Sequence, residues 1–335
     1  MEYEQLLELM SDEELDEEQD DADPHEEKEL VLSCNHENCH PVARLTETSP
    51  PADIQGIDWT NFGPFRQTRM KAYRNHFNAE FDVKSLEKDI LHPSESNDWQ
   101  ARAFTRKISP HYTHFQLRHL VRCSSFNDIF ALTMNGVSHW NPSLDRITDV
   151  LNYDVVPIGF NPVSMFVHDD FLYLGGYTGE LYGRNMSTDT ALFATARLSN
   201  ALSNIVNAIT KFPGLDQLLV SNNDNFAERF DMETMKSVRR FQTEWPINHA
   251  MANPDGKLIC LAGDCKAVLV IDSSSGKEVA TLNGHLDFSF GSSWHPGGLL
   301  LATGNQDLTA RVWDTRKLTT SVACLGGRMA AIRSV

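Results

Sequence analysis

The sequence predicts an all-β protein of the β-propeller class, built from repeated units of about four strands each. From residue 114 onward, short runs rich in Val, Ile, Phe, Tyr and Gly alternate with turn residues. One aromatic or apolar strand-closing residue recurs in each unit, at intervals of 42, 48, 41 and 42 residues. A period of roughly 40 to 45 residues with four strand-like pieces is typical of propeller blades. The recurring positions are Trp140, Tyr182, Phe230, Ile271 and Trp313.

A second set of landmarks keeps the same period. Turns at Asn161-Pro162, Asn253-Pro254 and His295-Pro296 precede apolar runs that each end at a Gly. We expect second strands in these runs, over 171–176, 258–263 and 299–304. Helical repeats of similar length are the alternative, but the many β-branched and aromatic residues argue against them.

The last complete unit is the most regular. Leu299 to Thr303 is an apolar run between glycines, which predicts a strand buried on both faces. A turn follows, and a second strand runs from Leu308 to Trp313. A buried Asp307 needs hydrogen-bond donors, and His285 and the Trp313 indole N–H are suitable. We therefore expect a structural staple here and not a catalytic triad.

This unit resembles a WD40 repeat of the transducin-like type. Gly284-His285, His295-Pro296, Asp307 and Val312-Trp313-Asp314 carry the resemblance. In the WD family four such residues form a buried hydrogen-bonded tetrad. The resemblance implies that the tetrad here is His285, Thr303, Asp307 and Trp313.

We expect five units and the opening strand of a sixth. Only the fifth has the full WD pattern; the fourth keeps Asp272 but has Ile271 in place of Trp, and the first three are degenerate. WD propellers usually close with seven blades, so the resemblance implies a chain truncated at its C-terminus, with exposed sheet edges. The expected propeller covers 114–335, with units at about 114–155, 160–198, 200–243, 245–282 and 284–323 and a partial unit at 326–335.

The formal net charge of −17 is concentrated at the N-terminus, where residues 1–30 hold fifteen Asp or Glu and one Lys. Residues 1–50 add three prolines and little apolar surface, which predicts a disordered acidic tail. Apolar residues at 6–10 are suited to a transient amphipathic turn for a partner, although a solvated tail is the simpler interpretation. The remaining body is near neutral, so nucleic acid is not an expected partner.

Two short motifs lie in this tail. Ser11 precedes three acidic residues, the context favoured by acidophilic kinases of the casein kinase 2 type, and is a candidate phosphosite. Residues 34–40 contain two Cys and two His, but they are too closely spaced for the two separated knuckles of a structural zinc site. We predict no metal and no cofactor.

Residues 51–113 form an N-terminal extension with a short basic and aromatic helix expected within 54–80. Six apolar residues, five of them aromatic, recur near helical spacing and should dock on the propeller. A docked helix with solvated charges is the simplest interpretation, because four basic residues are weak evidence for an RNA-binding surface. The basic residues of this segment, 66–76, are Arg66, Arg69, Lys71 and Arg74, with Arg74 followed by Asn75 and His76.

The expected location is nuclear or cytoplasmic. The N-terminus is acidic where a signal or transit peptide is basic or apolar. No apolar run approaches the roughly 20 residues that span a bilayer, so no membrane partner is expected. The six scattered Cys suit a reducing compartment.

No nucleotide-binding, nucleophile-elbow or zinc-protease motif occurs in the sequence, so we predict no enzymatic activity. A rigid propeller predicts a scaffold that binds other proteins. From about Trp59 onward the chain also resembles a family of poorly characterised WD-repeat proteins of plants and fungi. That resemblance brings no known activity.

One motif suggests an alternative function. Leu300 to Arg316 resembles the box, ending in Trp-Asp-x-Arg, of WD proteins that dock on the adaptor of cullin-4 ubiquitin ligases. In that family the Arg projects from the blade and carries the contact. The alternative is therefore a substrate receptor, and a nucleic-acid-associated factor using segment 66–76 is a third. The matching residues are Asp307, Val312, Trp313, Asp314 and Arg316, of which only Asp314 with Arg316 adds to what any WD blade needs.

Overall fold

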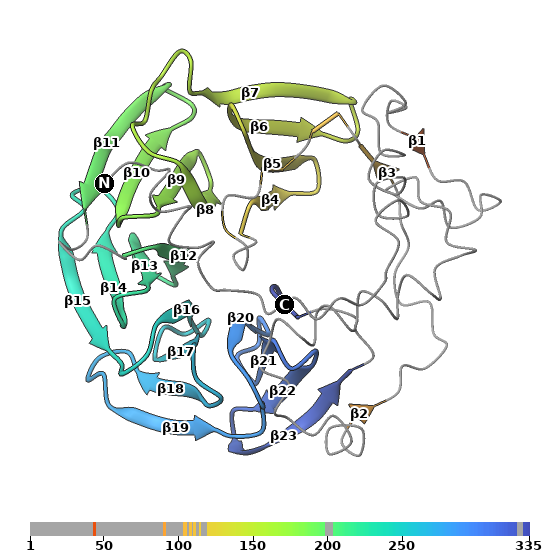
Figure 1. Ribbon diagram of the computed structural model, residues 1–335, viewed down its shortest axis with the longest axis vertical. Coiled ribbons are helices and arrows are strands. Elements are labelled where there is room, and N and C mark those ends of the chain that lie inside the picture. Colours follow the sequence, from red (N-terminus) through yellow and green to blue (C-terminus); the bar gives the residue numbers. More distant parts are fainter. Residues whose placement is uncertain are drawn as a thin grey trace, which may run out of the picture.

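The computed structural model shows five four-stranded blades arranged around a common axis (Figure 1). It describes residues 43–44, 90–91, 103–105, 107–108, 110–111, 114, 119–197, 204–326 and 331–335. All regular secondary structure within these ranges is β-strand. Over the same ranges there is no helix long and apolar enough to cross a membrane. The prediction of an all-β propeller is confirmed.

Each blade is a meander of four antiparallel strands. The first blade contains β4 (Val121–Ser125), β5 (Asp128–Thr133), β6 (Gly136–Asn141) and β7 (Arg146–Asn152). The second contains β8 (Pro162–His168), β9 (Phe171–Gly176), β10 (Glu180–Asn185) and β11 (Thr190–Arg197). The third contains β12 (Val206–Phe212), β13 (Gln217–Asn222), β14 (Phe226–Asp231) and β15 (Ser237–Gln242). The fourth contains β16 (Ile247–Ala252), β17 (Leu258–Gly263), β18 (Val268–Asp272) and β19 (Glu278–Leu282). The fifth contains β20 (Ser289–Trp294), β21 (Leu300–Asn305), β22 (Ala310–Asp314) and β23 (Lys317–Leu325).

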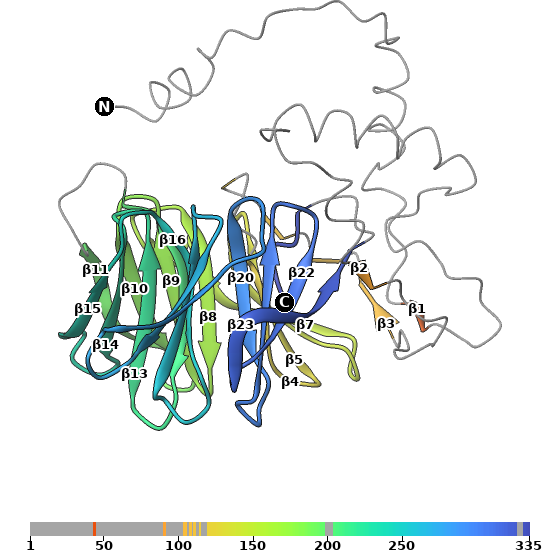
Figure 2. The same cartoon turned by 90° about the horizontal axis from the view of Figure 1, so that it is seen from below.

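The first strand of each blade lies nearest the axis and the fourth lies at the rim (Figure 1). Because the strands are antiparallel, their connections gather at two opposite ends of the propeller (Figure 2). We call the end with the second-to-third-strand turns and the inter-blade connections the connector face. The opposite end, with the other two turns of each blade, is the hairpin face.

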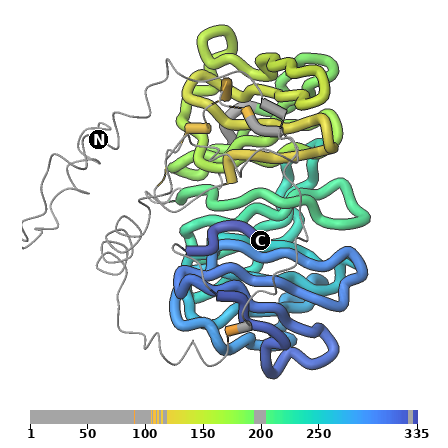
Figure 3. The backbone as a smooth tube through the Cα atoms, turned by 90° about the vertical axis from the view of Figure 1, so that its right-hand side faces the viewer, coloured from red at the N-terminus to blue at the C-terminus, as the bar shows by residue number. Residues whose placement is uncertain are grey.

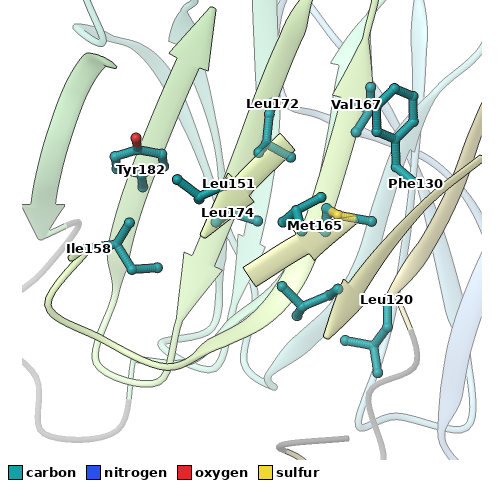
Figure 4. Packing of buried hydrophobic residues seen from close by; sticks show 11 residues of the cluster. Leu120, Phe130, Leu151, Ile158, Met165, Val167, Leu172, Leu174 and Tyr182 are labelled. Atoms are coloured by element: carbon teal, nitrogen blue, oxygen red, sulfur yellow. The ribbon is translucent and has the colours of Figure 1, made fainter. Parts of the chain in front are cut away.

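The recurring residues that predicted the repeat all lie on third strands. Each is at most 9% exposed, and each pairs with an apolar residue of the second strand. Trp313 opposes Leu301, for example, and Tyr182 opposes Leu174. Four of them, Tyr182, Phe230, Ile271 and Trp313, belong to apolar clusters that span two blades. Figure 4 shows the cluster between the first and second blades, around Met165. The repeat period therefore records the apolar contacts that hold one blade on the next.

Polar side chains of the innermost strands join neighbouring blades. Ser164 Oγ donates to the Val206 carbonyl at 2.7 Å, and Asn207 Nδ2 donates to the Ile247 carbonyl at 3.0 Å. Asn248 Nδ2 continues the series to the Ser289 carbonyl at 3.1 Å. The pairing register shifts around Asn207 and around Asn248, which marks β-bulges at both positions. A bulge redirects a side chain out of the regular alternation, and here it turns the amide toward the next blade.

One expectation for the fifth blade is wrong. Leu299 and Leu300 are 50% and 36% exposed, so the run is not buried on both faces. The reason is that β21 begins only at Leu300, while Leu299 belongs to the preceding turn. Part of the expected opening strand of a sixth unit, residues 327–330, lies outside the described residues, and residues 331–335 have no regular secondary structure. Ile332 N donates to the Asn305 carbonyl at 3.0 Å, and the C-terminal end lies beside β20 near the axis (Figures 1 and 3).

Little of the region before residue 119 is described. Within the tail expected to be disordered, β1 (Ala43–Arg44) pairs antiparallel with β3 (Ala103–Phe104). β2 (Ile90–Leu91) adds a parallel strand to the rim edge of β23. The expected helix within 54–80, the basic segment 66–76, Ser11 and the Cys and His cluster at 34–40 lie outside the described residues.

A buried pair of histidines joins three blades near the axis. The rings of His119, just before β4, and His249, on β16, are centred 5.2 Å apart. His249 Nδ1 lies 2.9 Å from Ser292 Oγ on β20. Burial, followed by the nearby charge of Arg122, lowers the pKa of His119 to about 3. Burial, then His119 and Arg122, also hold the pKa of His249 well below its usual value.

The buried histidine pair predicts that the folded protein becomes less stable in mild acid. The histidines are neutral in the folded protein, whereas in the unfolded chain they take up protons below about pH 6.5. The free energy of unfolding should be unaffected by them above that pH. It should then fall by up to about 1.4 kcal/mol per pH unit for each histidine as the pH drops toward the folded-state pKa. Among the described residues, Arg122 from β4 carries the charge that acts on both histidines, and Cys260 from β17 shares the Ser292 hydroxyl with His249.

Urea denaturation of the full chain between pH 7 and pH 5 measures this loss. His119→Phe, which keeps an aromatic ring in place, should reduce the pH dependence. His295→Phe is the matched control, because His295 is exposed on the hairpin face. An unchanged slope in His119→Phe would show that the pair does not control acid stability.

Candidate functional site

The four tetrad residues of the fifth blade form one continuous hydrogen-bonded chain. His285 Nδ1 donates to Asp307 Oδ2 at 3.0 Å, which leaves Nε2 to accept from the Thr303 hydroxyl at 2.8 Å. The Trp313 indole N–H donates to the same hydroxyl oxygen at 2.9 Å. The indole thus reaches Thr303, and its expected role as a donor to Asp307 is wrong. The indole reaches Thr303 because β21 and β22 pair Leu301 with Trp313, which places Thr303 two residues away on the same face of the sheet.

Asp307 is the most heavily bonded member. Its carboxylate also accepts from the backbone N–H groups of Leu286 at 3.0 Å and Thr309 at 2.9 Å, and from the Thr309 hydroxyl at 2.6 Å. Burial alone would raise the pKa of Asp307. The hydrogen bond and charge of His285 outweigh burial and lower it. The ionised carboxylate thereby ties the connection before β20 to the turn between β21 and β22.

An Asp, a His and a hydroxyl in sequence also occur in hydrolase triads, but this arrangement is internal. Thr303 is 0% exposed and the side chains of His285 and Asp307 are fully buried. The hydroxyl already contacts both the imidazole and the indole. A nucleophile must reach its substrate, so the geometry suits a structural role.

Arg316 lies in the turn between β22 and β23, on the hairpin face, with 70% of its side chain exposed. It folds back on Asp314: Nε is 2.9 Å from Oδ1 and Nη2 is 2.6 Å from Oδ2. Hydrogen bonds from Arg316 lower the pKa of Asp314 to about 2. The hydrogen bond to Asp314 and its negative charge raise the pKa of Arg316. The neighbouring turn contributes the half-exposed Leu299, whose carbonyl accepts from Thr315 N at 2.9 Å.

The five predicted partner-binding residues therefore divide into two groups. Asp307 and Trp313 are buried in the tetrad, and Val312 is half-buried on β22. Only Arg316, with part of Asp314, is available to another protein. The sequence motif brings these residues into one blade without placing them on one surface.

A further surface was missed by the sequence interpretation. Met134 and Val155 are 74% and 76% exposed on the connector face of the first blade. Tyr153 N donates to the Asn135 carbonyl at 2.9 Å, which joins the two loops. The Asn135-Gly136 dipeptide is a strong turn signal, and it could have identified Met134 as a loop-tip residue. Nothing in the sequence indicates that Val155 lies on the loop joined to it.

The described residues contain no group of three or more His, Cys, Asp and Glu side chains placed to hold a metal ion. The four described cysteines, Cys123, Cys260, Cys265 and Cys324, are free thiols.

Comparison with known proteins agrees with this architecture. Residues 276–314 match the family described as "WD domain, G-beta repeat". This chain contains a WD40 repeat. The matched segment ends at Asp314, so it includes the whole tetrad.

Curated relatives match over part of their length. Eukaryotic translation initiation factor 3 subunit I of Caenorhabditis elegans is 28% identical over 114 residues, which are 30% of this chain and 35% of that protein. A guanine nucleotide-binding protein subunit beta of Schizosaccharomyces pombe is 31% identical over 94 residues, 28% of this chain and 30% of that protein. The chain thus matches only about a third of the length of either protein.

A solved structure shows the same fold. One chain of the crystal structure of the Mitotic Checkpoint Complex superposes with a TM-score of 0.54 and 18% identity, over 63% of this chain and 66% of that chain. At this identity the likeness concerns the fold alone.

The tetrad predicts that replacing Asp307 destabilises the folded protein much more than replacing Asp314 of the same blade. Asp307→Ala should lower the free energy of unfolding by about 3 kcal/mol, because it leaves buried donors unsatisfied. Asp307→Asn should cost less, since it keeps the shape and one acceptor oxygen. Asp314→Ala is the control and should change the urea midpoint little, because its ion pair is at the surface. Equal midpoints for Asp307→Ala and Asp314→Ala would contradict a stabilising tetrad.

Proposed function

We propose that this chain is a non-enzymatic scaffold of the nucleus or cytoplasm, and that a protein partner binds the connector face of its first blade. The observation that carries the proposal is the exposure of Met134 and Val155 on two loops joined by a backbone hydrogen bond. Single exposed apolar residues are common on soluble proteins, but exposed apolar residues on two joined loops favour an interaction surface.

The first of these loops is held in one conformation. Gly136 has a φ of 154°, and a Cβ there would lie 1.8 Å from the Leu151 carbonyl oxygen. Thr133 Oγ1 donates to the Gly136 carbonyl at 3.1 Å. A loop fixed before binding loses little conformational entropy when a partner arrives. Met134 is therefore suited to act as a preformed apolar anchor.

The matched relatives support a role in an assembly. Two of the matched proteins are named as subunits, of a translation initiation factor and of a guanine nucleotide-binding protein. We extend this only to the class of function, binding of other proteins, and not to the identity of a partner.

The proposal is tested by affinity capture with the full chain and quantitative mass spectrometry. Met134→Asp combined with Val155→Asp should reduce recovery of specific partners at least tenfold, because a charge in an apolar contact remains unpaired. Leu215→Asp is the matched control. It places the same charge on a 46% exposed leucine at the hairpin face of the third blade. Full recovery with the double variant would overturn the proposed surface.

A second candidate function is docking on the adaptor of cullin-4 ubiquitin ligases. The exposed Arg316 beside Leu299 on the hairpin face favours it. The guanidinium is already held by Asp314. An adaptor must therefore recognise the Asp314–Arg316 pair as a unit or separate its two members.

Binding of the purified adaptor to the full chain tests this candidate. Arg316→Ala should abolish binding. Arg316→Lys should weaken it, because lysine keeps the charge but loses the planar two-pronged contact. Lys277→Ala is the control, since Lys277 occupies the corresponding turn of the fourth blade. Binding that survives in Arg316→Ala would exclude a role for this box.

A further inference from the structure

Arg122 lies near the axis, at the end of β4 that joins the connector face. β4 and β8 are the innermost strands of the first and second blades (Figure 1). Arg122 Nε donates to the Met165 carbonyl oxygen of β8 at 3.1 Å. The guanidinium carbon also lies 5.7 Å from the centre of the Phe166 ring. These contacts direct the side chain across the junction between the two blades, and its charge acts on His249 of the fourth blade.

The positive charge of Arg122 has no counter-charge in the described part of the chain. No carboxylate there lies within ion-pair distance of the guanidinium. Burial lowers the pKa of Arg122, and Cys123 is the neighbour whose charge opposes this shift. A thiol is mostly uncharged at neutral pH. The neighbouring His119 and His249 are neutral as well, so the group as a whole carries a single positive charge.

The guanidinium also has unused hydrogen-bond donors. Among the described residues it donates only through Nε, and Nη2 is buried without an acceptor. Buried donors without an acceptor are rare in native proteins, and each calls for an explanation. A water molecule would satisfy the N–H group but would leave the charge uncompensated. An anion would satisfy both.

The contact between the first two blades does not itself require a charge. Met165 and Ala250 each lie two residues after the bulge of an innermost strand. The Ala250 carbonyl oxygen accepts from the Thr210 hydroxyl of the third blade at 2.8 Å. A neutral threonine thus makes the bond between the third and fourth blades that Arg122 makes between the first and second. The partial burial of a charge at Arg122 therefore needs another reason.

We propose that Arg122 is a binding site for one carboxylate group, which reaches it from the connector face. A carboxylate carries one negative charge, which matches the single positive charge of the site. Its two oxygens fit the paired N–H groups that a guanidinium offers. A phosphate dianion would leave an unpaired negative charge beside two neutral imidazoles. Binding at Arg122 does not depend on the apolar surface of Met134 and Val155.

Thermal unfolding of the full chain in sodium acetate tests the site, with sodium chloride of equal ionic strength as the reference. At about pH 7.5, acetate is ionised and the histidines are neutral. About 100 mM acetate should raise the thermal midpoint by at least about 3 °C, because a ligand that binds only the folded protein stabilises it. Arg122→Met, which keeps the aliphatic stem, should lose this rise. Arg229→Met is the matched control and should retain it, because the Arg229 guanidinium already donates to Gln217.

Three outcomes would overturn the proposal. The absence of any rise above the chloride reference would show that no carboxylate binds. An equal rise in Arg122→Met would show a general effect of acetate on the protein surface. A larger rise with sodium phosphate than with acetate would show that the site takes a dianion. If Arg122→Met does not fold, Arg122→Lys decides, because lysine keeps the charge, loses the paired donors and should lose more than half of the rise.

A small carboxylic acid and an acidic side chain of a partner protein offer the same group, and affinity capture with Arg122→Met separates these two sources. Loss of the partners that Met134→Asp with Val155→Asp also loses would assign the carboxylate to the partner. Unchanged recovery, together with the acetate effect, would assign it to a small molecule. Because the acetate measurement uses no partner, it stands whether or not the apolar surface binds one.

Discussion

The contact between the innermost strands of successive blades is the constraint on which the rest of the structure depends. A four-stranded meander cannot bury both of its faces alone, so each blade needs a neighbour. Apolar side chains supply most of the contact, but they are non-directional. The bulged Asn207 and Asn248 add direction, because each amide finds a backbone carbonyl of the next blade. These bonds fix the register of the third blade on the fourth and of the fourth on the fifth.

The blades of this chain are stabilised in two different ways. In the fifth blade, the tetrad ties the incoming connection to the blade through a buried carboxylate, two ring side chains and a hydroxyl. In the degenerate blades, an apolar residue of the third strand packs against its partner on the second. Tyr182 against Leu174 and Phe230 against Leu218 are examples. Blades that have lost the polar signature still fold, because the apolar contact between neighbours is retained.

A rigid ring leaves function to its turns and edges. The connector face presents the apolar loops of the first blade, and the hairpin face presents Arg316. These surfaces are separate, so they are available to different partners at the same time. Charge also divides along the chain, since residues 1–30 carry most of the net charge of −17 and the rest of the chain is near neutral.

The sequence by itself determined the fold class and the repeat period, because a repeated contact with a neighbouring blade leaves the same residue type at the same interval. The third-strand positions from Trp140 to Trp313 were identified in this way. The members of the tetrad came from the resemblance of the last unit to a WD repeat. The sequence did not determine which apolar side chains are exposed to solvent. Leu299 and Leu300 look like core residues in the sequence but lie at the start of a strand, near solvent.

Only the tertiary structure decided which side chains meet across blades. The bulges that aim Asn207 and Asn248, the pairing of His119 with His249, and the joining of the loops at Met134 and Val155 all depend on how distant strands are placed. The histidine pair and the joined loops leave no periodic trace, since each occurs once. Asn207 and Asn248 recur 41 residues apart, but which backbone carbonyl each amide reaches depends on the neighbouring blade. Local pattern therefore specified the blades, and packing between blades specified the surfaces on which a function can be built.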